Sequence, residues 1–391
     1  MKKMLRKGFV LGVTLLCGTS LVGCAEQANN DVVNSKEGTE SEVLSGDVYK
    51  IGGIGPLTGA QSSYGNSVKQ GAEIAIEKIN EEGGVNGKKL ALVFEDDVCD
   101  EEKAITAYNK IMDEEPVAIM GAVTSGCSVA VSGESINDGI LQVTPSGSTI
   151  KCTEEANSFR ICFTDPIQGE TMAKFVAEKG YKNVAIIYDV ASDYSKGIKD
   201  AFVAEAKNNE MNIVAEESFN SGDVDFKTQL TKIKSSGADC IFLPIYYAEV
   251  AAITEQAKTV GIDLPYFGCD GWDGVIKELE GETAEVEGAV FLTPFIATLD
   301  VPEIKEFTSV YNETYGSDPG QFAADGYDAI YAIKLAIEQC GDEVTNEKMI
   351  EAMTKIEVKG LTGDMTFTPE GEPNKTVMFA EIKDGAYVAV Q

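Results

Sequence analysis

The sequence has 391 residues, with 64 Asp and Glu against 32 Lys and Arg and no His. A formal net charge of −32 argues against nucleic acid as a partner and against electrostatic attachment to anionic lipid. Without His, the chain lacks His-based catalytic triads, His-ligated zinc and the commonest general base.

The N-terminal region has the order of a bacterial export signal. Basic residues at positions 2–7 precede a mostly apolar run from Phe9 to Leu21, which is too short to span a membrane comfortably. The run ends in Leu21-Val22-Gly23-Cys24, which resembles the lipobox of bacterial lipoproteins. The alternative is an ordinary signal peptide with a chance Cys. The resemblance implies that residues 1–23 are removed as a lipoprotein signal peptide and that Cys24 is acylated.

Residues 24–47 are mostly polar, small or acidic, so they cannot bury enough apolar surface to fold. We therefore expect a disordered acidic tether. After residue 47 no segment approaches 18 uninterrupted apolar residues, which predicts a soluble body. That body is longer than one hydrophobic core usually supports, so two domains are expected.

From Val48 onward, short apolar runs alternate with amphipathic helical patterns, as in an α/β protein with parallel sheets and right-handed crossovers. A long late helix is expected over 319–339. Two βα series, before and after about residue 165, predict two similar lobes. The expected strands are Tyr49–Ile54, Leu90–Phe94, Val117–Met120, Ile140–Val143, Val184–Tyr188, Ile213–Glu216, Cys240–Ile245, Tyr266–Gly268, Ala289–Leu292, Met365–Phe367 and Val377–Ile382.

Ligands of open α/β sheets bind outside the carboxyl ends of the strands. Two lobes that face each other would enclose a ligand between two sets of strand-end loops. The loops in question are Gly55–Gly65, Gly121–Ser128, Thr144–Thr149, Tyr188–Lys196, Ile245–Glu249 and Gly268–Gly274.

Two of these loops carry small hydroxylated residues. Ser125 and Ser128 stand where a strand leads into a helix, and free amides at a helix N-terminus favour an anion such as a ligand carboxylate. Plain N-capping explains these residues equally well. Ser146, Gly147 and Ser148 follow the next strand, where they could contact a carboxylate or an ammonium. A polar turn is the simpler alternative there.

Other candidates are an acid and several aromatic residues. Asp270 lies at a strand end and could pair with a ligand ammonium, although a solvated turn Asp is the usual finding in so acidic a chain. Amphipathic rings suit binding clefts, and packing is the alternative role for each. The aromatic candidates are Tyr64, Tyr194, Tyr246, Tyr247 and, less strongly, Phe322.

Three patterns typical of enzymes or cofactor sites are incomplete. Ser148-Thr-Ile-Lys151 matches S-x-x-K but lacks the motifs that accompany it in β-lactamases. The glycines after Gly53 are misplaced for a dinucleotide site, and Asp96, Asp97 and Asp100 lack the spacing of a calcium loop. We therefore expect neither catalysis nor a cofactor or metal.

Taken in order, the motifs of the whole body resemble the type I solute-binding proteins of branched-chain amino acid ABC importers. The resemblance covers roughly 48–391. It is carried by Ile54-Gly-Pro-Leu-Thr-Gly-Ala, Tyr64-Gly, Ala75-x-x-x-Ile79-Asn-x-x-Gly-Gly-x-x-Gly87, Asp96-Asp-x-Cys-Asp100, Gly121…Ser125…Gly139-Ile, Thr144-Pro-Ser, Phe159-Arg, Asp193-Tyr-Ser-Lys-Gly197, Asp225-Phe, Asp270-Gly-Trp and Gly326-Tyr-Asp328.

The resemblance implies a type I periplasmic binding protein fold, with two Rossmann-like lobes joined by a three-crossing hinge. Lobe 1 would comprise 48–164 and 295–361, and lobe 2 would comprise 165–294 and 362–391. Ser125 would hold the ligand carboxylate, the loop from Ser146 to Ser148 would contact carboxylate and ammonium, and Asp270 would pair with the ammonium. Tyr64, Tyr194 and Tyr246 would line the cleft. The family often has Glu where Asp270 stands, so the acid is one methylene shorter here.

The family sometimes has a disulfide in the neighbourhood of Cys99 and Cys127. Both residues follow strands that we expect to lie side by side, so we predict a disulfide between them. Two free thiols are the alternative.

The implied function is capture of a small amino acid, with a branched-chain or aliphatic side chain, for ABC transporter permease subunits. The protein would be a monomer on the extracellular face of the cytoplasmic membrane, held by its lipid. The same fold could instead bind an amide, urea or an aromatic acid, or serve as a sensory receptor. A secreted hydrolase is a third, weaker alternative.

Overall fold

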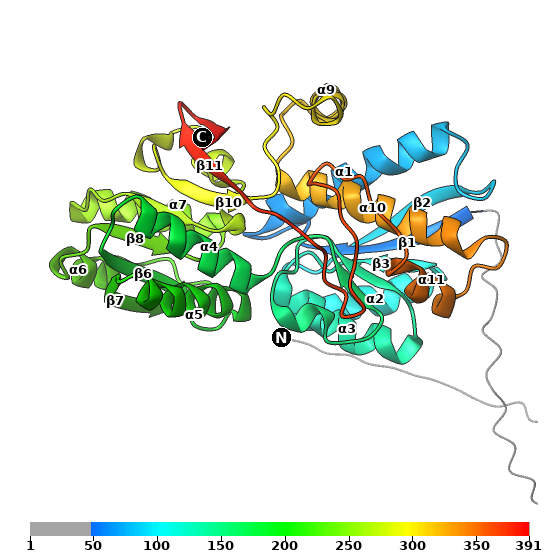
Figure 1. Cartoon of the computed structure of the whole chain (residues 1–391), viewed down its shortest axis with the longest axis horizontal. Helices are drawn as coiled ribbons and strands as arrows, with labels where there is room; N and C mark the ends of the chain where they lie inside the picture. The colour runs from blue at the N-terminus through cyan, green and yellow to red at the C-terminus, as the bar shows by residue number, and fades with distance from the viewer. Residues whose placement is uncertain (1–47, 391) are drawn as a thin grey trace, which may run out of the picture. The chain divides into compact units, whose positions relative to one another are not determined.

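The computed structural model describes residues 48–390, and Figure 1 shows the arrangement of its helices and strands. The predicted signal peptide (1–23), the acylated Cys24 and the tether (24–47) lie outside the described residues. Of the helices within 48–390, none is both long and apolar enough to cross a bilayer.

The first part of the described chain forms a five-stranded sheet in which all neighbouring strands are parallel. Parallel pairing requires crossover connections, and a helix follows each of the first three strands. The strands, in the spatial order β2-β1-β3-β4-β5, are β1 (Val48–Gly55), β2 (Lys89–Asp96), β3 (Ala118–Met120), β4 (Gln142–Thr144) and β5 (Ser158–Arg160). The connecting helices are α1 (Ser62–Glu81), α2 (Glu101–Met112), α3 (Ser125–Asp138) and the short 3₁₀ turn η1 (Ile150–Thr153).

The second sheet has seven strands in the order β12-β11-β10-β9-β8-β6-β7. Strands β6 to β10 are parallel, whereas β11 pairs antiparallel with β10 and β12 antiparallel with β11. The strands are β6 (Asn183–Asp189), β7 (Asn212–Phe219), β8 (Cys240–Leu243), β9 (Tyr266–Gly268), β10 (Val290–Thr293), β11 (Met378–Lys383) and β12 (Ala386–Ala389). The helices of this part are α4 (Asp165–Glu178), α5 (Asp193–Asn208), α6 (Lys227–Ser235), α7 (Tyr247–Val260), η2 (Asp270–Trp272), α8 (Val275–Glu278) and η3 (Thr283–Glu285).

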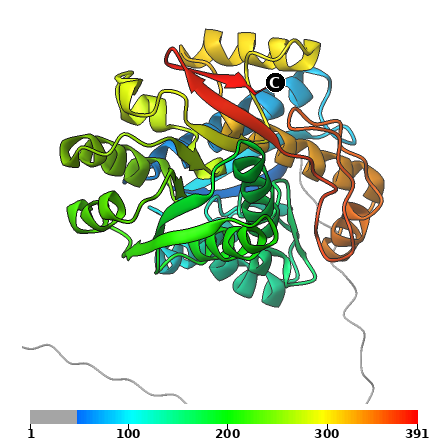
Figure 2. The ribbon, with the colours of Figure 1, turned by 60° about the vertical axis from the view of Figure 1, so that its left-hand side comes forward.

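Between β10 and β11 the chain forms three helices: α9 (Pro302–Tyr315), α10 (Gln321–Cys340) and α11 (Asn346–Met353). Helix α10 packs along α1, beside the five-stranded sheet (Figure 1), and the chain then returns to the other sheet as the β11–β12 hairpin, drawn in red in Figure 2. Glycines allow α1 and α10 to meet backbone to backbone. A Cβ on Gly71 would lie 1.8 Å from the carbonyl oxygen of Ala323, and one on Gly326 would lie 2.3 Å from that of Val68.

The α/β class and the two mainly parallel sheets agree with the sequence prediction, and most predicted strands lie within one or two residues of the observed ones. The prediction of a strand at Met365–Phe367 is wrong. Those residues form only isolated antiparallel bridges, Val358 to Met365 and Phe367 to Pro373, because nearby turns interrupt a continuous ladder. Strands β5 and β12, of three and four residues, were not predicted.

Candidate functional site

Loops from the carboxyl ends of the two sheets meet around one small cavity. Its volume is about 10 Å³, which is near the minimum that holds a single water. Seven of the nine predicted ligand-binding residues line it, together with three that were not singled out. The lining residues are Tyr64, Val123, Thr124, Ser125, Ser146, Tyr194, Tyr246, Asp270, Gly271 and Phe322.

Ser125 and the loop after β4 form the hydroxyl- and amide-rich side of the cavity. Ser125 is the first residue of α3, and its Oγ accepts hydrogen bonds from the backbone amides of Ser148 (3.1 Å) and Thr149 (3.3 Å). The Oγ of Ser148 is buried, beside the buried carboxyl group of Asp165. Ser125 stands at the N-terminus of α3, where the helix dipole favours negative charge, so its hydroxyl can receive a carboxylate.

Gly147 does not line the cavity, but a larger residue there would have to displace buried side chains. A Cβ there would lie 2.7 Å from the Oγ of Ser128 and 2.7 Å from the Oγ1 of Thr144. Ser128 serves this packing rather than the cavity, since its hydroxyl donates to the Ala122 carbonyl (2.6 Å) and to Thr144 Oγ1 (2.9 Å).

Asp270 is the acid of the cavity, and it is 4% exposed. Its Oδ1 accepts a hydrogen bond from the Tyr194 hydroxyl (2.6 Å), and its backbone N–H donates to Oε1 of Gln168 (3.0 Å). Burial raises the pKa of Asp270 to about 6, although the hydrogen bond from Tyr194 favours the charged form. A buried carboxylate of this kind lacks a cation, and an ammonium group would supply one.

Aromatic rings form the remaining wall. The ring of Tyr64 lies 4.1 Å from that of Phe322 and 5.4 Å from that of Tyr246, and Tyr246 stacks on Tyr194 at 4.8 Å. The hydroxyl groups of Tyr64 and Tyr194 already bond to protein atoms, Gly271 and Asp270 respectively. The rings therefore present mainly apolar surface to the cavity.

Further contacts hold the two sets of loops together. Tyr247, at the start of α7, donates its hydroxyl to the Ala60 carbonyl (2.6 Å) and accepts from the Ser63 amide (3.2 Å). At the surface, Lys151 and Asp193 form an ion pair at 2.7 Å. The cavity is therefore closed on the side of both loop sets, and an amino acid could enter only if these contacts separated.

Val123, Thr124 and Gly271 line the cavity but were not predicted individually, although all three belong to loops identified from the strand ends. Gln168 and Gln321 were missed altogether. Gln321 donates from its Nε2 to the Asp270 carbonyl (2.6 Å), a contact between residues 51 positions apart that no local motif signals.

Cys99 and Cys127 are free thiols whose side chains lie next to each other. The expectation that their strands are neighbours is wrong, because β1 lies between β2 and β3. The loops after β2 and β3 nevertheless bring the two residues together. Their disulfide stays a prediction.

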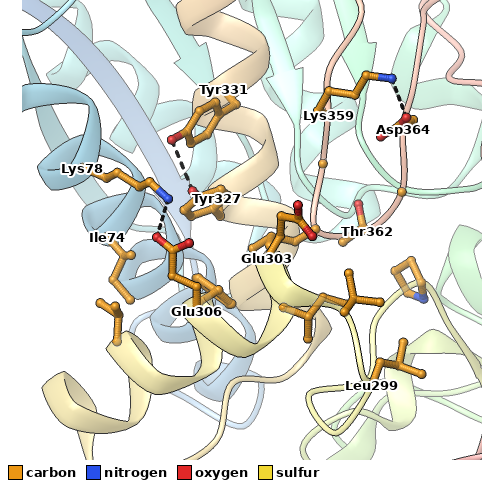
Figure 3. A pocket seen from close by; sticks show the side chains of 18 of the residues that line it. Ile74, Lys78, Leu299, Glu303, Glu306, Tyr327, Tyr331, Lys359, Thr362 and Asp364 are labelled. Atoms are coloured by element: carbon orange, nitrogen blue, oxygen red, sulfur yellow. Dashed lines mark hydrogen bonds and ion pairs between the residues drawn. The ribbon is translucent and has the colours of Figure 1, made fainter. Parts of the chain in front are cut away.

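Four larger hollows lie outside the small cavity in the described part of the chain. One, of about 450 Å³, shares Thr124, Tyr194 and Tyr246 with the cavity and also contains Cys99. Another, of about 570 Å³, lies among α1, α9, α10 and the segment 359–364 (Figure 3). An ion pair between Lys78 and Glu306 (2.7 Å) bridges α1 and α9 there, and none of the predicted site residues lines this hollow. Within 48–390, no group of three His, Cys, Asp or Glu side chains is arranged to hold a metal ion.

Two α/β sheets have strand-end loops that close over a hydroxyl-rich helix N-terminus, a buried acid and an aromatic wall, an arrangement typical of binding proteins of the cleft type. Comparison with known sequences gives the family. A sequence model described as periplasmic binding protein matches residues 48–386, and the chain belongs to that family. Membership supports a location outside the cytoplasm.

The named relatives bind amino acids. The chain is 29% identical over 340 residues to a leucine-, isoleucine-, valine-, threonine- and alanine-binding protein of Pseudomonas aeruginosa, covering 86% of this chain and 90% of that protein. It resembles the crystal structure of a leucine-binding protein of Thermotoga maritima with a TM-score of 0.81 and 31% identity, covering 88% and 98% of the two chains. It also resembles a branched-chain amino acid transporter substrate-binding protein of Streptococcus pneumoniae in complex with isoleucine, with a TM-score of 0.81 and 29% identity, covering 88% and 100%.

Proposed function

We propose that this chain is the substrate-binding subunit of an ABC importer and that it binds a small aliphatic amino acid between two lobes. The observation that carries the proposal is the pairing of an amide-rich anion site at Ser125 with the buried acid Asp270 in one cavity. An α-amino acid is a small ligand that carries both complementary charges.

The aliphatic side chain is inferred from the wall of the cavity. The rings of Tyr64, Tyr246 and Phe322 pack against one another, and the hydroxyl groups of Tyr64 and Tyr194 already have protein partners. A polar ligand side chain would lose water here without gaining a matching partner, whereas an apolar one is favoured. The names of the relatives from P. aeruginosa and S. pneumoniae agree with this class of ligand.

The proposed lobes are 48–164 with 295–361 and 165–294 with 362–391. In this account the ligand contacts Ser125, Ser146, Gly147 and Ser148 from lobe 1 and Asp270 from lobe 2. A ligand that bonds to both lobes stabilises the closed form, and the permease subunits recognise that form. No step in this cycle changes a covalent bond, so the protein is not an enzyme.

We also propose that Cys24 carries the lipid anchor and that the protein is a monomer on the extracellular face of the cytoplasmic membrane. The support is the order of basic, apolar and Leu-Val-Gly-Cys segments. Cys24→Ser should release the protein into the medium and remove the mass of the acyl chains. Membrane retention of that variant with an unchanged mass would refute the anchor.

A thermal-shift panel tests the ligand class. It would contain leucine, isoleucine, valine, alanine and threonine, with urea, acetamide and benzoate as ligands that lack one or both charges. An amino acid at about 100 times its dissociation constant should add about 2.7 kcal/mol to the free energy of unfolding. A response to benzoate or an amide and to none of the amino acids would refute the proposal.

A further inference from the structure

Arg160, the last residue of β5, lies beneath the loop that contains Ser148. Its side chain is fully buried. The guanidinium donates to the carbonyl oxygens of Gly147 (2.9 Å) and Thr149 (2.9 Å), to Thr153 Oγ1 (3.0 Å), and from both Nε and Nη2 to Oε1 of Glu372 (3.1 and 2.8 Å). Such a set of contacts uses the planar, five-donor geometry that only Arg has.

The carbonyl contacts of this loop fix the direction of the amides that bond to Ser125, a residue that lines the cavity. In a trans peptide unit the C=O and the N–H point in opposite directions. In the unit that joins Gly147 to Ser148, the C=O points at Arg160 and the N–H therefore points at Ser125 Oγ. In the next unit, the Ser148 C=O accepts from the amide of Asp165 (3.0 Å), and the Thr149 N–H points at the same Ser125 Oγ.

Glu372 belongs to the segment that leads from α11 back to β11, and it holds Arg160 from the other side. Its Oε1 also accepts from Thr153 Oγ1 (2.7 Å), and the carbonyl of the preceding Gly371 accepts from the Arg160 amide (3.1 Å). The Glu372 side chain is 30% exposed, whereas that of Arg160 is inaccessible. One guanidinium therefore joins the anion-site loop to the segment that returns to the second sheet.

We propose that Arg160 is the positioning residue of the anion site: it directs the Ser148 amide at Ser125 Oγ and so orients the hydroxyl that meets the ligand carboxylate, and Glu372 keeps it in that orientation. The inference rests on the proposed function in so far as the ligand carries a carboxylate. Arg160 itself touches no ligand, since it does not line the cavity and the loop backbone lies between. If the ion pair of Arg160 and Glu372 only stabilised the fold, its loss would weaken binding of a carboxylate ligand and of the matching amide equally.

The test compares Arg160→Lys and Glu372→Gln with wild type and with Lys359→Gln. Lys359 forms exposed ion pairs with Glu357 and Asp364 in the segment before β11, so its variant is a charge-loss control away from the loop. Amide hydrogen exchange of Ser148 and Thr149 is measured by NMR in the ligand-free full chain. Leucine and leucinamide, which lacks the carboxylate, are then titrated by calorimetry.

A lysine ammonium cannot hold both loop carbonyls and Glu372 in the arrangement of a guanidinium. Arg160→Lys should therefore speed exchange of the two amides and weaken leucine binding about tenfold to a hundredfold, in keeping with the loss of hydrogen bonds to a charged group. Leucinamide binding should change less than about twofold, because the contacts to the ammonium are retained. Glu372→Gln should act in the same direction with a smaller effect, and Lys359→Gln should match wild type.

Equal losses for leucine and leucinamide, or wild-type exchange of both amides in Arg160→Lys, would overturn the proposal. If Arg160→Lys does not fold, Glu372→Gln decides the matter, and wild-type exchange in that variant counts against the proposal. Exchange is measured without ligand, so it remains informative if wild type fails to bind leucine. That failure would refute the proposed function alone.

Discussion

The hydroxyl of Tyr64, on the helix after β1, donates a hydrogen bond to the carbonyl of Gly271, on the turn after β9, and accepts one from the amide of Tyr247. Tyr64 is 1% exposed, so these bonds lie in the interior of the closed cleft. The side chain of one loop set thus satisfies two backbone groups of the other. Closure is stabilised by protein–protein contacts as well as by any ligand.

Tyr64→Phe removes both bonds and keeps the ring. An unsatisfied buried carbonyl and amide together should cost the closed form about 1–3 kcal/mol, which corresponds to roughly fivefold to hundredfold weaker ligand binding by calorimetry. Tyr327→Phe is the matched control, because its hydroxyl bonds to that of Tyr331 away from the cavity. Equal dissociation constants for Tyr64→Phe and wild type would contradict the role of this contact.

Alanine substitutions of two serines in α3 should affect ligand affinity and protein stability differently. Ser125→Ala deletes the acceptor of the Ser148 and Thr149 amides and a donor to the carboxylate, so we expect about tenfold or greater loss of affinity with a small change in melting temperature. Ser128→Ala breaks buried bonds to Ala122 and Thr144, and it should lower the melting temperature while changing affinity less than about threefold. The opposite pattern would show that Ser128 is the anion-site residue.

The pKa of Asp270, about 6, makes a prediction about pH. Only the carboxylate form pairs with an ammonium, so affinity should be constant above pH of about 6 and fall towards tenfold per unit below it. Calorimetric titrations at pH values from about 4.5 to about 8, which lie on both sides of this pKa, measure the dependence of affinity on pH. A flat profile for wild type would contradict the assignment of Asp270.

The raised pKa of Asp270 also determines whether its contribution to protein stability increases or decreases with pH. The folded-state pKa lies above the unfolded value of about 3.9, so the contribution of Asp270 to stability is complete at low pH and is lost as pH rises through about 6. Ligand-free Asp270→Asn, which cannot ionise, should therefore melt above wild type at pH of about 8, and the difference should vanish near pH of about 4. A variant that melts below wild type at the higher pH would reverse this sign.

The sequence predicted the elements whose pattern is local. Apolar runs such as Cys240–Leu243 are buried on both faces and were located closely, and the strand-end rule led to the loops that line the cavity. Strand β12 was missed because its four residues have no distinct pattern without the pairing to β11. The contacts of Arg160 with Glu372, 212 residues away, arise only in the folded chain. The motif Phe159-Arg drew attention to Arg160, but the sequence alone did not predict what its side chain does.

The central claim is that one ligand must satisfy Ser125 and Asp270 together, and a calorimetric titration of wild type and Asp270→Asn tests it most directly. The ligands are leucine, isocaproate (leucine without its amino group) and isoamylamine (leucine without its carboxylate). Losing one partner of a buried charge pair costs about 2–5 kcal/mol, so both analogues should bind wild type at least about 30-fold more weakly than leucine does. Asp270→Asn should lose affinity for leucine by a similar factor and bind isocaproate at least as well as wild type does, because it leaves no unpaired buried charge. If isocaproate binds wild type as tightly as leucine and Asp270→Asn binds leucine normally, the two-charge account is wrong.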